Sequence, residues 1–145
     1  MKIAFESPDM MISVAHDLSI LTDCARICIN DIHYDPEAGI VSILMKRVEI
    51  TGFRMSILRA VRPIYGKTRI DTLLTIKQVV DFSLQVDELL ISRCNSCFTV
   101  MEGSTIIGNN IYLSSLEEAS GKVMCRAIAT VKEIDIDFVD QAKKQ

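Results

Sequence analysis

The sequence lacks any long apolar run. No uncharged hydrophobic stretch approaches the ~20 residues that a membrane-spanning helix needs. Glu6, Asp9 and Asp17 also interrupt the segment in which a secretory signal would carry its apolar region. We therefore expect no membrane span and no secretory signal.

Cysteines are too few and too irregular for a disulfide framework. The chain has five, and an odd count with irregular spacing suits reduced thiols better than a set of disulfides. Together with the missing signal, this predicts a cytoplasmic protein.

The common catalytic and cofactor motifs are also missing. The sequence contains no Gly-x-Ser-x-Gly elbow, no His-Glu-x-x-His motif and no dinucleotide fingerprint. The stretch "YGKT" at 65–68 is similar to the end of a phosphate loop, but Val61 stands where that loop needs its first glycine. These absences favour a protein without a catalytic role, and we predict no cofactor.

Neither sign of charge dominates the chain as a whole. The 145 residues carry a formal net charge of -3, so the overall charge gives no reason to expect nucleic acid or an anionic membrane as a partner. Hydrophobic residues make up 49% and charged residues 24%, the balance of a globular protein. Without linkers or repeats, we predict a single domain over residues 1–145, with a solvated tail at 140–145.

The first segment with a clear pattern predicts a helix. Ser7, Pro8 and Asp9 have the chemistry of a helix start, namely a hydroxyl cap, a proline for the first turn and an early acid. Apolar residues then recur at spacings of three and four, so we expect a short amphipathic helix within residues 9–22.

From residue 26 the hydrophobic period falls to two. The alternation in 26–34, the turn "DPEAG" at 35–39 and the return run 40–50 predict a β-hairpin. Residues 51–68 are ambiguous between helix and loop, because Gly52, Pro63 and Gly66 interrupt the pattern.

The rest of the chain also alternates. Strands are predicted for 80–86, 96–102, 123–131 and 134–138, with a hairpin at 104–115 that turns at Gly108, and a phase slip near Gln78 indicates a bulge or bend. We predict a mainly β fold, an antiparallel hairpin-linked sheet that is curled, barrel-like or a sandwich, with one short N-terminal helix. An α+β fold is the alternative.

One block of the sequence is similar to a known family. The stretch "LTDCARICINDIHYDPEAGIVSILMKR" resembles the opening of the mostly alphaproteobacterial domain-of-unknown-function family 2948, with Leu21, Asp23, Asp31, Tyr34, Pro36 and Arg47 at the positions of its pattern. Weaker similarity extends over roughly residues 15–140. The resemblance implies a bacterial cytosolic protein and no particular activity.

Two clusters could hold a metal. Cys94 and Cys97 form a Cys-x-x-Cys pair, but the second pair, Cys24 and Cys28, would lie about 13 Å apart on an extended strand, too far to share one ion. We therefore favour unreactive thiols, with a weak metal site or a regulatory disulfide as alternatives.

The second cluster surrounds His33. Asp31 and Asp35 flank it at a spacing that puts all three side chains on one sheet face, within reach of a divalent cation or of acid–base work. The favoured interpretation is a polar strand end whose acids cap backbone N–H groups.

A basic segment is the feature that is hardest to explain structurally. Residues 46–69 contain seven cations and one acid, a net charge of +6 that leaves -9 for the rest of the chain. Such asymmetry suits an anion site or a nucleic-acid surface, but it can equally pair with the chain's own acids at 117–118 and 133–140. The candidate anion-binding residues are Arg54, Arg59, Arg62, Lys67 and Arg69.

Taken together, these patterns favour a small interaction module. Its high hydrophobicity suggests that it associates with itself or with a protein partner through a strand edge or an apolar sheet face. The alternatives are an anion- or nucleic-acid-binding domain using residues 46–69, and a metal-assisted enzyme around His33 or the cysteines.

Overall fold

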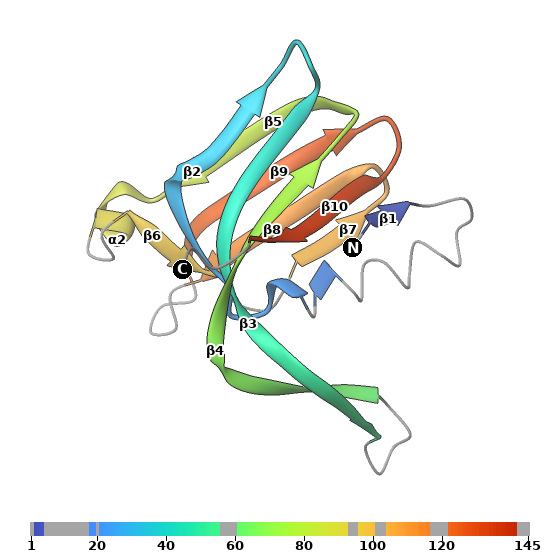
Figure 1. Cartoon of the computed structure of the whole chain (residues 1–145). Helices are drawn as coiled ribbons and strands as arrows, with labels where there is room; N and C mark the ends of the chain where they lie inside the picture. Colours follow the sequence, from blue (N-terminus) through green and yellow to red (C-terminus); the bar gives the residue numbers. More distant parts are fainter. Residues whose placement is uncertain are drawn as a thin grey trace.

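The protein is built from two antiparallel β-sheets, as the computed structural model in Figure 1 shows. The structure describes residues 2–4, 18–19, 21–55, 61–92, 96–100, 104–116 and 122–141. The predicted mainly β, antiparallel class is confirmed. The sheets pack face to face as a sandwich, and neither closes into a barrel.

The larger sheet has six strands in the order β1-β10-β4-β3-β2-β6. Their bounds are Lys2–Ala4 for β1, Arg26–Asp35 for β2, Ile40–Met55 for β3, Val61–Ile76 for β4, Cys97–Thr99 for β6 and Asp135–Asp140 for β10. β3 and β4 are the long strands, with 16 residues each.

The smaller sheet has four strands in the order β5-β9-β8-β7. Its strands are β5 at Val79–Val86, β7 at Ser104–Ile107, β8 at Asn110–Leu116 and β9 at Val123–Val131, and a short helix α2 at Glu88–Ser92 follows β5. The predicted hairpin at 104–115 is confirmed as β7 and β8, and Gly108 takes the left-handed conformation (φ 58°) that its turn needs.

The predicted hairpin at 26–50 is confirmed as β2 and β3. The Asp35 carboxylate accepts hydrogen bonds from the backbone N–H groups of Glu37 and Ala38, at 3.1 and 3.2 Å. Gly39 completes the turn at φ 66°, and its carbonyl accepts a bond from the N–H of Val79. The bonds to the Asp35 carboxylate therefore close the hairpin, and the bond from Val79 to the Gly39 carbonyl joins the turn to the smaller sheet.

The phase slip near Gln78 is where the chain changes sheets. Gln78 has φ 56° and lies between the end of β4 in one sheet and the start of β5 in the other. Its carbonyl accepts a hydrogen bond from the N–H of Lys132 at 2.9 Å, which holds the corner against the β9–β10 connection. The predicted bend between two strand pieces is confirmed.

The core lies between the two sheets. Buried side chains from the larger sheet, such as Ile43 and Leu74, face those from the smaller sheet, such as Ile111 and Leu113, in one continuous cluster. Ala127 and Ala129 on β9 are also fully covered, which matches the close approach of a second layer that small residues predict.

Two expectations are corrected. Residues 51–68 form neither helix nor loop where they are described, because β3 continues to Met55 and β4 starts at Val61. The N-terminal helix within 9–22 is not supported, since most of that segment lies outside the described residues. No helix in the described ranges is long and apolar enough to cross a membrane.

Candidate interaction site

The far ends of β3 and β4 form an arm. On one side of this pair, β2 pairs with β3 and the ladder ends at Arg26↔Lys46. On the other side, β10 pairs with β4 and the ladder ends at Asp140↔Thr72. Beyond Val48↔Arg69, β3 and β4 pair only with each other in the described part of the chain. Figure 1 shows these ends leaving the body of the molecule together. We call residues 48–55 and 61–69 the arm.

Register shifts bend the arm at its base. The pairing is irregular between Val48 and Ile50 and again between Ile50 and Gly52. Bulges of this kind increase strand twist and redirect a ribbon. Gly66 lies inside the first irregularity, where a Cβ atom would approach the Glu49 carboxylate to 2.8 Å. The sequence breaks at Gly52 and Gly66 therefore mark bends within strands rather than strand ends.

Side chains of the arm also bind the turn before β2. The Tyr65 hydroxyl donates to the Asp23 carboxylate at 3.4 Å, and Arg69 Nη1 donates to the Cys24 carbonyl at 2.9 Å. Partial burial, and then the Asp23 charge, raise the pKa of Tyr65, so the phenol stays protonated at neutral pH. These contacts fix the direction of the arm at its base.

The described members of the predicted anion-binding set all lie on the arm. Arg54 and Lys67 are exposed on the arm, and the backbone of Arg62 lies directly opposite that of Arg54. Arg69 lies at the base, and Arg59 is outside the described residues. The anion site expected at these five residues therefore stays a prediction.

One basic residue of the segment is paired inside the chain. Arg47 is only 9% exposed, and its Nη2 donates to the Asp140 carboxylate at 2.8 Å. Thr72 accepts a bond from Arg47 Nε and donates to the same carboxylate. The Arg47 hydrogen bond is the main reason why the pKa of Asp140 is lowered. Pairing with the acids at 133–140 thus occurs at Arg47.

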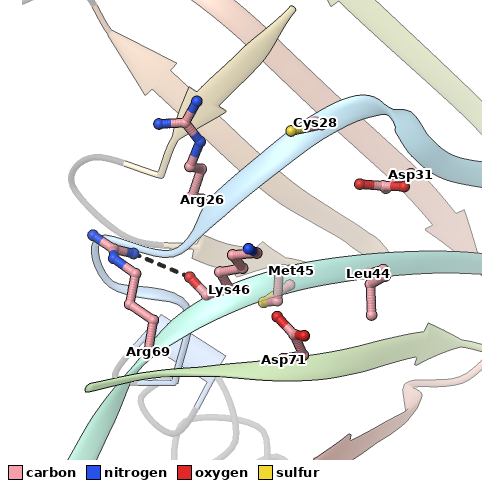
Figure 2. A pocket seen from close by; sticks show the side chains of 8 residues that line it. All are labelled: Arg26, Cys28, Asp31, Leu44, Met45, Lys46, Arg69 and Asp71. Carbon is pink, nitrogen blue, oxygen red and sulfur yellow. Dashed lines mark hydrogen bonds between the residues drawn. The ribbon is translucent and has the colours of Figure 1, made fainter. Parts of the chain in front are cut away.

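A second feature is a hollow of about 540 Å³ on the outer face of the larger sheet. Figure 2 shows basic side chains gathered at one end of it, with Asp31 and Leu44 toward the other end. We call this feature the hollow. It is lined by Arg26, Cys28, Asp31, Leu44, Met45, Lys46, Arg69 and Asp71.

The hollow exists because the β2–β3 ladder is irregular. Ile32 pairs with Ile43, but Ile27 pairs with Met45, so three extra residues of β2 lie between these pairs. The strands separate over this stretch. The same irregularity brings Arg26 opposite Lys46, a pairing that the alternation of the sequence does not predict.

The cysteine expectations are partly wrong. Cys28 on β2 and Cys97 on β6 form a disulfide across directly opposed positions. The expectation of reduced thiols therefore fails at this pair, and a structural link replaces the Cys94–Cys97 pairing. Cys94 is outside the described residues. Cys24 and Cys125 are free, and burial raises the pKa of Cys125 to about 11.

The weak metal site around His33 gains no support. No three His, Cys, Asp or Glu side chains within the described ranges are arranged to hold a metal ion. Asp35 caps the hairpin turn, Asp31 lines the hollow, and His33 is exposed opposite Ser42. The capping role expected of the acids is confirmed for Asp35.

Comparisons of the chain with known proteins found no similar protein. No family model, curated protein or solved structure matches the chain. The resemblance to domain-of-unknown-function family 2948 therefore stays a prediction.

Proposed function

We propose that this protein is a non-catalytic interaction module that associates with a second copy of itself through the arm. The observation that carries the proposal is the isolated two-stranded pairing of the arm. A two-stranded hairpin alone is marginally stable in water, and both of its edges offer unpaired backbone groups to another chain. An arm of this length is therefore best explained by a partner that covers it.

Apolar side chains on the arm agree with this function. Ile64 and Tyr65 are 43% and 41% exposed on β4. Both lie beyond the reach of the third strands that cover the rest of β3 and β4. Burying such side chains in a contact stabilises it by roughly 25 cal/mol per Å² of apolar area.

Charge favours a second copy as the partner. The arm carries Arg54, Arg62, Lys67 and Arg69 against Glu49, a net charge of +3, which leaves -6 for the rest of the chain. Exposed acids lie on other elements, including Asp81 on β5 and Glu88 on α2. A basic arm on one copy is therefore complementary to the acidic body of another, which speeds association and sets its orientation.

Matched substitutions test the proposal. Ile64→Lys should weaken self-association at least about tenfold, or ~1.4 kcal/mol, in light scattering over a concentration series. Val80→Lys is the control, because Val80 is 51% exposed on the edge strand β5 of the other sheet. Equal weakening by the two variants, or a monomer at all concentrations for the unchanged protein, would remove the arm as the contact element.

Polyanion binding is a second candidate, favoured by one observation. Arg54 and Arg62 occupy directly opposed positions on the arm, and like charges opposite each other destabilise a ladder unless an anion offsets them. Arg54 and Lys67 are both exposed. Nucleic acid is the partner to test.

Fluorescence anisotropy with a labelled oligonucleotide at low salt distinguishes this candidate. Arg54→Glu with Lys67→Glu should reduce binding and flatten its salt dependence, whereas Lys132→Glu, a surface change at the β9–β10 turn, should not. Absence of binding at low salt excludes the candidate.

A further inference from the structure

The hollow combines three cations, which outnumber its two carboxylates, with the exposed apolar side chain of Leu44. Arg26 and Lys46 are exposed and directly opposed on β2 and β3, and neither forms an ion pair with another described residue, although Lys46 also lies directly opposite Asp71 of β4. Like charges at directly opposed positions repel each other. An anion held between them would convert this repulsion into attraction.

The third cation of the hollow is fixed in place. Arg69 Nη1 donates to the carbonyls of Cys24 and Lys46, at 2.9 and 3.1 Å, and Figure 2 shows the second of these bonds. A guanidinium has five N–H donors, and those on Nε and Nη2 have no partner among the described residues. A cation that is already ordered loses little side-chain entropy when it binds a ligand.

Apolar atoms continue from this cationic end. Leu44, which lines the hollow at its far side, is 40% exposed, whereas Met45, which also lines it, is buried in the core and only 1% exposed. Leu44, Leu73 and Val139 are directly opposed across β3, β4 and β10. An outward-facing apolar row of this kind is unusual on a sheet face exposed to water, and it could accept a hydrocarbon group.

The acids of the hollow restrict the charge of the ligand. Asp31 and Asp71 also line it, so three cations and two carboxylates leave one net positive charge. A monoanion neutralises this charge, whereas a phosphate dianion or a nucleic-acid backbone would meet the two carboxylates as well. The volume of about 540 Å³ is within the range of small-molecule sites.

We propose that the hollow binds a small organic monocarboxylate. Its carboxylate lies between Arg26, Lys46 and Arg69, and its hydrocarbon part lies along Leu44 and the apolar row that continues from it. Guanidinium groups pair with carboxylates through parallel hydrogen bonds, which matches the free donors of Arg69 and Arg26. The hollow shares Arg69 with the base of the arm, but binding of a carboxylate there does not depend on self-association.

Titration with straight-chain carboxylates followed by amide NMR tests the proposal. Acetate, butanoate, hexanoate and octanoate should bind with increasing affinity, by up to about fourfold for each methylene group that reaches Leu44 and its apolar row. Shifts should centre on β2 and β3 around Arg26 and Lys46. Hexanol, which has the chain without the charge, and inorganic phosphate, which has charge without a chain, should both bind at least tenfold more weakly than hexanoate.

Substitutions locate the site. Arg26→Gln and Lys46→Gln should each weaken hexanoate binding about tenfold, and Lys132→Gln should leave it unchanged. Leu44→Ser should reduce the gain in affinity from butanoate to octanoate, which gives a readout independent of the cations. The proposal is overturned if no carboxylate binds, if phosphate binds as well as hexanoate, or if Lys132→Gln weakens binding as much as Arg26→Gln.

Discussion

Arg47 and Asp140 form a salt bridge at the point where the arm leaves the sheet. Arg47 Nη2 lies 2.8 Å from Asp140 Oδ2, and Thr72 joins both side chains through its hydroxyl. The three residues belong to β3, β10 and β4. Arg47 points inward on β3, so this contact satisfies a cation that would otherwise be buried without a counter-charge.

Removing the acid should destabilise the fold. Asp140→Ala leaves the Arg47 guanidinium without its carboxylate, and we expect a loss of about 1 kcal/mol in the free energy of unfolding, a modest value because Asp140 is half exposed. Replacing both residues, as Arg47→Met with Asp140→Ala, should recover most of this loss. Urea unfolding measures all three variants. If the double variant is less stable than Asp140→Ala, the pair is not the reason for the loss.

The same pair predicts a pH dependence. Arg47 lowers the pKa of Asp140 below its ordinary value of 3.8, so the carboxylate binds a proton more readily in the unfolded chain. The stabilisation is fully present above the unfolded pKa and is lost as pH falls through the lower folded pKa. The urea midpoint of the unchanged protein should therefore fall more steeply below about pH 4 than that of Asp140→Ala. Parallel curves for the two proteins would contradict this assignment.

Reduction of the Cys28–Cys97 disulfide should cost considerable stability. The bond closes a loop with a sequence separation of 69 residues and ties the edge strand β6 to β2. Chain-entropy arguments give about 4 kcal/mol for a loop of this size. Urea unfolding with and without a phosphine reductant measures the loss, and thiol titration should gain two groups. The control is Cys24→Ser, which removes a free thiol and leaves the disulfide intact. Reduction should destabilise this variant as much as it destabilises the unchanged protein.

Two turn glycines provide a matched pair of substitutions. Both have positive φ, but a Cβ at Gly39 would lie 3.0 Å from the Val79 carbonyl oxygen, while a Cβ at Gly108 would meet nothing within 4 Å. Gly108→Ala should cost about 1 kcal/mol from backbone strain alone. Gly39→Ala should cost more, because the contact between the two sheets must also shift. Thermal unfolding of the two variants compares their losses of stability. Equal losses would show that the backbone at Val79 can move away from the added Cβ at no cost.

Local sequence patterns predicted the strands and turns well. Alternation marked both hairpins, "DPEAG" predicted the turn at 35–39, one of the acids beside His33, Asp35, caps it as expected, and the slip near Gln78 predicted the bend. These features depend on neighbouring residues along the chain. The arm was harder to predict because Gly52, Pro63 and Gly66 are typical of breaks, and a bulged ribbon contains the same residues as a loop.

Contacts between distant segments could not be predicted from the pattern. A regular ladder closing at Asp35↔Ile40 would place Lys46 opposite Ile29, whereas the irregularity in β2 places it opposite Arg26. The disulfide has the same origin, because β6 reaches Cys28 from a segment far along the chain. The cations of the hollow and the Cys28–Cys97 bond therefore required knowledge of the register.

Shortening the arm tests the central claim most directly. Val48 and Arg69 face each other, so an Asn-Gly turn can join them and replace residues 49–68 while every residue of the described core is retained. Sedimentation velocity over a concentration series should show an oligomer for the full chain and a folded monomer for the shortened chain. A full chain that remains monomeric at high concentration, or a shortened chain that associates equally well, would contradict the account.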